Sequence, residues 1–152
     1  MGFLKKILFG ISLLVGIMSF TTECSAYELL VEEPIQLTEN SKEIIYRDVI
    51  TSLLVPHIQK EVNNYYKEYL TEAPMIFAYS VDIISAKRQY ETGYLIELEV
   101  IAHPYVGAHN TVGDERLIIE TGGLGSVEVK KFEHIKSYPL PTHLQNIIKK
   151  PY

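Results

Sequence analysis

The chain has 152 residues, 19 acidic and 14 basic, so its formal net charge at neutral pH is −5. This acidic balance argues against a nucleic-acid partner, which would require a basic face, and gives no reason to expect attraction to anionic lipid. The only cysteine is Cys24, so we expect one domain that folds on its hydrophobic core without disulfide bonds.

Residues 1–26 have the layout of a secretory signal peptide. Two lysines precede an uncharged apolar run over residues 7–20, and small residues follow it. A helix of that length rises about 21 Å, less than the roughly 30 Å hydrocarbon core, so a stable membrane span is disfavoured. We expect cleavage after Ala26 and secretion, with retention at the cell wall or anchoring by an uncleaved N-terminus as alternatives. A lipid anchor on Cys24 is disfavoured because Glu23 stands where that processing requires a small residue.

A long helix is predicted after a tether at residues 27–40, which mixes acidic residues with Pro34. Asn40 can cap the helix, with Glu43 completing a capping box. Apolar residues then recur every three or four positions as far as Leu70, namely Ile50, Leu54, Ile58, Val62, Tyr65 and Tyr69.

Pro56 lies inside this apolar stripe. A proline removes one backbone hydrogen bond and presses on the preceding turn, so we expect a kink near Leu53 or two helices that abut.

The second half of the chain has the two-residue period of antiparallel strands. We predict four strands at residues 79–88, 94–102, 116–120 and 127–130, with a tight hairpin at the glycines of TGGLGS. A short amphipathic turn should follow Thr142. Residues 41–152 therefore form one α+β domain, with a Pro-kinked helix packed on a four-stranded meander, like a cystatin-like or NTF2-like roll.

Residues 103–115 are predicted to be the long connection between the second and third strands. Gly107 and Gly113 are expected in left-handed conformations. Long loops in compact domains often carry function, so this loop is a candidate site.

The loop brings His103, His109, Asp114 and Glu115 near one another along the chain, but it lacks a diagnostic metal-binding spacing such as HExxH. We expect solvated histidines, no bound metal and no cofactor. His134, beside Glu133, is interpreted as part of a charged outer strand end.

No serine lies in the GxSxG setting of a nucleophile elbow. The candidates in the folded region are Ser80, Ser85, Ser126 and Ser137. Without a recognisable base beside any of them, we expect that the protein is not an enzyme and has no catalytic residues.

Tyrosines supply the remaining candidates for binding. Tyr65 and Tyr69 lie on the packing stripe and are expected to fill the core, whereas Tyr66 points elsewhere and should be freer. The residues proposed for binding are Tyr66 and three from the loop: Tyr105, His109 and Asn110.

Four stretches, PHIQKEVNNYYKEYL, YSVDIISAKR, HPYVGAHNTVG and KFEHIKSYPLP, resemble a family of small exported proteins of Bacillus and related spore-forming bacteria, grouped as a domain of unknown function. The resemblance covers roughly residues 50–150. It implies a secreted or wall-associated protein with no established activity or catalytic residues. In that family the position of His103 is commonly not histidine, whereas PYVG and His109 match, which weakens a site that uses both histidines.

We therefore expect an exported, non-catalytic protein of unknown molecular function that binds a partner or ligand at the cell envelope. The alternative is a metal-dependent protein or hydrolase centred on His109. The two differ in geometry, because the alternative requires a carboxylate and a second histidine within about 4 Å of His109, facing a cavity.

Overall fold

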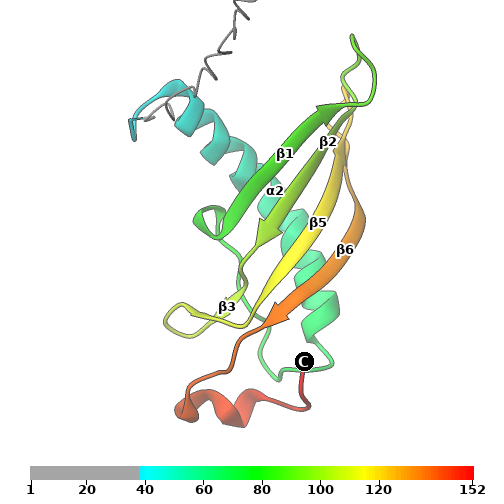
Figure 1. The fold of residues 1–152 in the computed structure, drawn as a ribbon. Coiled ribbons are helices and arrows are strands. Elements are labelled where there is room, and N and C mark those ends of the chain that lie inside the picture. Colours follow the sequence, from blue (N-terminus) through cyan, green and yellow to red (C-terminus); the bar gives the residue numbers. More distant parts are fainter. Residues whose placement is uncertain (1–37) are drawn as a thin grey trace, which may run out of the picture. The chain divides into compact units, whose positions relative to one another are not determined.

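The computed structural model describes residues 38–152, so the expected signal peptide and most of the tether lie outside the described residues. Helix α2 (Lys42–Tyr66) packs against a four-stranded antiparallel sheet, which confirms the α+β class (Figure 1). Among residues 38–152, no helix combines the length and apolarity needed to cross a membrane.

Helix α2 begins one residue later than expected. The Oγ of Ser41, not Asn40, caps it by accepting a hydrogen bond of 3.3 Å from the Ile44 N–H. The helix is continuous through Pro56, so the expectation of two abutting helices is wrong. The kink near Leu53 remains a prediction. It ends at Tyr66, with Lys67 as its C-cap, and does not reach Leu70.

The buried face of α2 differs from the predicted stripe at both ends. Ile50 is 42% exposed and Tyr66, expected to be freer, is fully buried. Tyr65 and Tyr69 are partly buried against the core. The buried residues of α2, three or four positions apart, are Thr51, Leu54, Ile58, Val62 and Tyr66.

The strands of the sheet follow the predicted meander, in the order β1-β2-β5-β6. β1 (Val81–Arg88) starts two residues later than expected, because Ala78–Ser80 form a 3₁₀ turn, η1. β2 (Ile96–Ala102) leaves Tyr94 outside, 76% exposed. β5 (Gly113–Thr121) and β6 (Val127–Ser137) are longer than predicted and are joined by the expected glycine hairpin.

Two bulges in β6 decide which of its side chains face the core. Lys130 and Ile135 have no partner in the register with β5, so the inward alternation shifts by one residue at each bulge. His134 and Ser137 consequently lie on the same side of the strand as Phe132. The expected charged outer end at His134 is therefore wrong.

The predicted loop of residues 103–115 is largely regular structure. It contains a hairpin of β3 (Tyr105–Val106) and β4 (Asn110–Thr111), and its last three residues belong to β5. Gly107 has the expected left-handed conformation, with φ of 54°. The second left-handed residue is His109, with φ of 62°, and not Gly113.

The chain after β6 packs back onto the end of α2. The 3₁₀ helix η2 (Thr142–Ile147) confirms the predicted turn, and Ile147 is buried. Ile148 forms an antiparallel bridge with Leu70.

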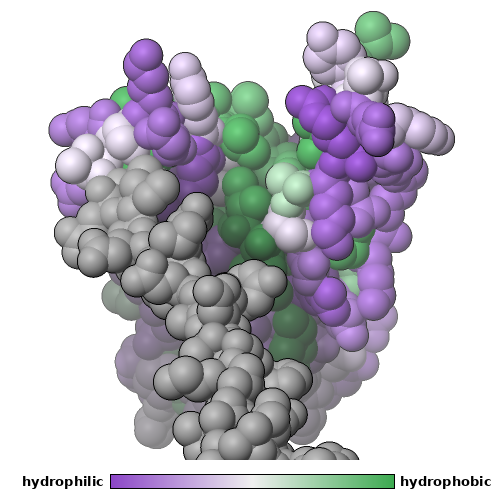
Figure 2. Space-filling model, turned by 45° about the horizontal axis from the view of Figure 1, so that its top comes forward, coloured by the Kyte–Doolittle hydropathy of each residue, from purple (hydrophilic) through white to green (hydrophobic). Residues whose placement is uncertain are grey.

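The N-terminal half of α2 diverges from the sheet and leaves an open cleft. Figure 2 shows apolar side chains lining the gap between the two layers. On the helix, Arg47 and Asp48 line this cleft, and Ile50 is 42% exposed. The core is therefore concentrated at the C-terminal half of α2.

Candidate functional site

Four side chains from two parts of the chain meet beside the β3–β4 hairpin, and we call them the aromatic surface: Phe77, Tyr79, Tyr105 and His109. An isolated bridge between Met75 and Tyr105 holds the segment before η1 against β3. Phe77 and Tyr79 are at least half exposed, whereas Tyr105 is buried and anchors the group.

The three benzene rings of the aromatic surface are nearly parallel. The Phe77 and Tyr79 centroids lie 5.7 Å apart with 17° between their planes. The Tyr105 centroid lies 6.1 Å from that of Phe77 and 6.2 Å from that of Tyr79, with 23° between planes in both pairs. The rings thus form a compact triangle.

Hydrogen bonds fix the polar edge of this triangle. The hydroxyls of Tyr79 and Tyr105 lie 2.6 Å apart, and Tyr79 Oη lies 3.1 Å from His109 Nδ1. The pKa of Tyr105 is raised to about 12, mainly by desolvation of its phenol and secondly by the hydrogen bond with Tyr79. The Tyr105 phenol is therefore protonated at neutral pH and can donate.

His109 occupies its place through a strained backbone. A non-glycine residue at positive φ is uncommon and costs on the order of 1 kcal/mol or more. The β3–β4 hairpin holds His109 in this conformation, and the Asn110 side-chain amide stabilises the turn by donating to the Val106 carbonyl at 3.3 Å. Such strain is often found where a side chain is positioned for function.

The structure brings together two of the four proposed binding residues. Tyr105 and His109 belong to the aromatic surface, and Asn110 supports the turn beside them. Tyr66 lies in the core, so the expectation that it is accessible is wrong. The sequence analysis missed Phe77 and Tyr79, because only the fold brings the segment before β1 to the hairpin.

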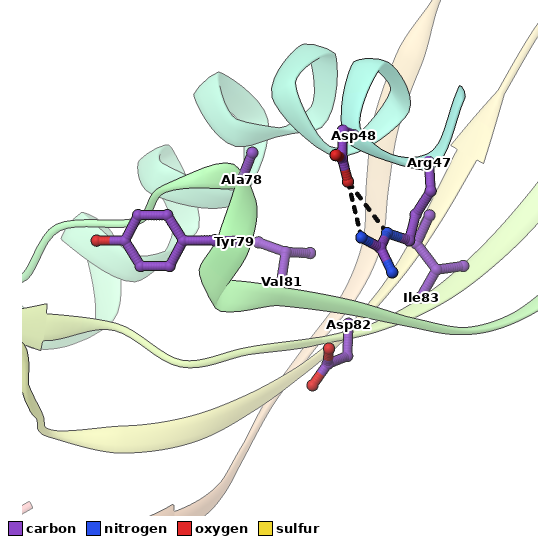
Figure 3. Close-up of a pocket in the computed structure, with 7 residues that line it drawn as sticks. All are labelled: Arg47, Asp48, Ala78, Tyr79, Val81, Asp82 and Ile83. Carbon is purple, nitrogen blue, oxygen red and sulfur yellow. Dashed lines mark hydrogen bonds and ion pairs between the residues drawn. The ribbon is translucent and has the colours of Figure 1, made fainter. Parts of the chain in front are cut away.

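A cavity of about 550 Å³ lies between α2 and the start of β1. Arg47 and Asp48 form an ion pair of 2.9 Å on the helix side, and Ile83 lines the strand side. Tyr79 borders the cavity, but its ring points away from the Arg47–Asp48 pair (Figure 3). The exposed face of the Tyr79 ring therefore belongs to the aromatic surface.

His103 belongs to a different cluster from His109. Its Nδ1 lies 2.7 Å from Asp114 Oδ1 and its Nε2 lies 3.2 Å from Asp82 Oδ2. The Tyr138 hydroxyl donates to the other Asp114 oxygen at 2.8 Å. Within residues 38–152, no group of three histidine, cysteine or acidic side chains could hold a metal ion.

Glu115, expected in a solvated loop, is fully buried in β5. Its Oε1 accepts a hydrogen bond of 2.6 Å from the Tyr66 hydroxyl and lies 2.9 Å from His134 Nδ1. His134 Nε2 lies 2.9 Å from Ser137 Oγ. Desolvation raises the pKa of Glu115, although its hydrogen bonds with Tyr66 and His134 oppose that change.

A family model described as a protein of unknown function, DUF3888, matches residues 46–136, more than half of the chain. The chain belongs to the DUF3888 family. The match includes every residue of the aromatic surface as well as Glu115 and His134, and it ends one residue before Ser137. The expected membership in a family of unknown function is confirmed. Neither the curated proteins nor the solved structures include a match to this DUF3888 protein.

Proposed function

We propose that this DUF3888 protein is exported and binds a saccharide chain of the cell envelope through the aromatic surface, and that this surface is a non-catalytic binding site. The observation that carries the proposal is the ring triangle, which is solvent-accessible at Phe77 and Tyr79 yet fixed by the buried Tyr105 and by hydrogen bonds. A surface ordered before binding loses little entropy when it binds.

The chemistry of the aromatic surface favours a saccharide over a charged ligand. None of its four side chains carries a charge when His109 is neutral. Aromatic faces bind the C–H faces of sugar rings, and phenol and imidazole groups at the edge can bond to sugar hydroxyls. The surface is open, which suits a polymer better than a small enclosed molecule.

The hydrogen-bond chain gives the surface an outward donor. If Tyr105 donates to Tyr79, the Tyr79 hydroxyl donates in turn to His109 Nδ1. A neutral imidazole that accepts at Nδ1 carries its proton on Nε2. His109 Nε2 is therefore the group that we assign to a ligand hydroxyl.

Export is supported by the signal-peptide layout of residues 1–26. We propose secretion with retention at the cell wall, in a Bacillus-type spore-forming bacterium, as the resemblance implies. We also propose that the domain is a cystatin-like or NTF2-like roll, because a helix on a curled meander fits both shapes.

The contacts favour this role over a metal-dependent protein or hydrolase centred on His109. The side chains around His109 are those of Tyr79 and Tyr105, and not a carboxylate with a second histidine. A nucleophilic or metal-assisted reaction requires such groups.

Cosedimentation with purified, protein-free bacterial cell wall tests the proposal. Wild-type protein should bind, and Tyr79→Ala should weaken binding by about 5- to 150-fold if stacking on its ring is worth roughly 1–3 kcal/mol, as for nucleobases stacked on aromatic side chains. Tyr90→Ala and Tyr94→Ala are matched controls, because both tyrosines are exposed in the β1–β2 hairpin, away from the aromatic surface.

Two results would contradict the proposal. One is absence of binding to the wall preparation by correctly folded wild-type protein. The other is equal loss of binding in the Tyr79 and Tyr94 variants. Binding to wall-extracted protein, but not to the protein-free wall, would identify a protein partner and exclude the saccharide.

A further inference from the structure

The chain Glu115–His134–Ser137 runs from the core to a second cavity. This cavity has a volume of about 350 Å³ and is lined by Ser137, by residues 138–140 and by residues of the C-terminal segment that include Ile148 and Tyr152. Ser137 is only partly buried. The buried carboxylate is thus connected, through two hydrogen bonds, to a hydroxyl at the wall of a cavity.

These three side chains have the relative geometry of an activated serine. A nucleophile needs a base within hydrogen-bond reach and a third group that orients the base. Here Ser137 Oγ and Glu115 Oε1 each lie 2.9 Å from opposite nitrogens of the His134 ring. The Tyr65 ring stacks on His134 with a centroid distance of 5.0 Å and holds the imidazole plane.

The hydroxyl proton of Ser137 is, however, used elsewhere. Ser137 Oγ donates to the main-chain oxygen of Tyr152 at 2.5 Å. A hydroxyl has one proton, so His134 Nε2 must donate to Ser137 rather than accept from it. His134 Nδ1 then shares a further proton with Glu115, either as imidazolium and carboxylate or as imidazole and carboxylic acid.

Moving the Tyr152 main-chain oxygen away from Ser137 changes this arrangement by one proton. Ser137 can then donate to Nε2, Nδ1 keeps the only imidazole proton, and Glu115 is a carboxylate. The other titratable groups that face His134 are the phenols of Tyr65 and Tyr66 from α2, and that of Tyr152 lies nearby. Burial raises the pKa of both Tyr65 and Tyr66, so these phenols stay neutral.

We infer that Ser137 is a masked nucleophile for carboxylic esters, with His134 as its base, Glu115 as a positioning residue and the Tyr152 main-chain oxygen as the mask. This activity goes beyond the proposed saccharide binding and uses none of the same residues.

The step follows ordinary acyl transfer. Ser137 Oγ forms a bond to the ester carbonyl carbon, and its proton passes to His134 Nε2. The carbon–oxygen bond to the alcohol breaks, and His134 returns the proton to the leaving oxygen. Water then attacks the acyl-serine by the same route and releases the acid. Glu115 stays ionised and stabilises the imidazolium throughout.

The Tyr152 side chain anchors the mask. Its ring lies 5.5 Å from that of Tyr66 and 6.3 Å from that of Tyr69, and its hydroxyl donates to the Tyr138 carbonyl at 3.1 Å. Tyr152→Gly removes these contacts while keeping the full chain length. Pro151→Gly loosens the same backbone and keeps the ring, so it serves as the second unmasking variant.

Labelling with an alkyl fluorophosphonate, followed by peptide mass spectrometry, tests the inference. Attack by Ser137 on phosphorus displaces fluoride and leaves a stable adduct. We expect faster labelling of Ser137 in Tyr152→Gly than in wild type. Ser137→Ala should abolish the adduct, His134→Gln should slow its formation, and His103→Gln, which alters a histidine of the other cluster, should not.

The inference is overturned if both unmasking variants keep their wild-type circular dichroism and form no adduct at Ser137. It is also overturned if His134→Gln labels as fast as its parent, since His134 would then not be the base. Equal labelling of wild type and of both unmasking variants would show that the Tyr152 main-chain oxygen is no mask.

Discussion

Glu115 illustrates what the fold does to a single residue. Burying a carboxylate without partners would cost free energy, because its hydrogen bonds to water are lost. In Glu115, hydrogen bonds with the Tyr66 hydroxyl and with His134 replace them. Gly113 completes this site, because a Cβ there would approach the Lys136 carbonyl to 2.7 Å and Glu115 Oε1 to 2.8 Å. The requirement for glycine at position 113 therefore comes from close approach and not from a left-handed turn.

The raised pKa of Glu115 predicts a specific pH dependence of stability. Between the ordinary carboxyl value of 4.5 and the raised value in the folded chain, the folded state binds more protons than the unfolded state. The free energy of unfolding should therefore fall as pH rises through this window, by at most about 1.4 kcal/mol per pH unit from this group. Glu115→Gln should remove that contribution.

Urea unfolding of wild type and Glu115→Gln over a series of pH values measures the difference. The matched control is Glu91→Gln, at the exposed turn between β1 and β2. If wild type becomes more stable relative to Glu115→Gln as pH rises through the window, the assigned direction of the shift is wrong.

Little of this residue-scale chemistry was predictable from sequence. His134 and Ser137 face inward because β6 has bulges at Lys130 and Ile135, and the alternating pattern of the sequence does not show where a bulge falls. Phe77 and Tyr79 were missed because their partner, the β3–β4 hairpin, lies more than twenty residues away in the chain.

Among the elements, the helix and the four strands of the larger sheet were predictable from the spacing of apolar residues. That spacing is about four residues in the helix and two in the strands. The buried face of α2 was predicted correctly only at its centre. Two neighbouring faces of this helix are apolar, and Ile50 and Tyr66 could not be assigned to one of them without the position of the sheet. The helix also diverges from the sheet toward its N-terminus (Figure 1).

This divergence predicts that the same substitution has different costs along one helix. Ile58 is fully buried, whereas Ile50 is 42% exposed. Ile58→Ala should lower the free energy of unfolding by about 2–4 kcal/mol, because it leaves a cavity in the core. Ile50→Ala should cost less than about 1 kcal/mol. Denaturant unfolding of the two variants checks this, and equal costs would mean that the N-terminal half of α2 packs on the sheet.

At the scale of the whole molecule, the fold places two separate sites on different parts of one small domain. The aromatic surface lies beside the β3–β4 hairpin, and the chain from Glu115 to Ser137 lies where β6 meets the C-terminal segment. The sequence indicated residues 103–115 as a candidate site, and Tyr105 and His109 from this stretch belong to the aromatic surface. The sequence could not identify a ligand, because only the fold brings the side chains of this surface together.

NMR mapping can show whether the aromatic surface binds a saccharide. A soluble, purified cell-wall glycan fragment would be titrated into the protein while the tyrosine and histidine ring signals are followed. We expect shifts for Tyr79, Tyr105 and His109 that saturate together, with the Tyr90 and Tyr94 signals unchanged. Saturable shifts confined to other residues, or no shifts at any glycan concentration, would contradict it.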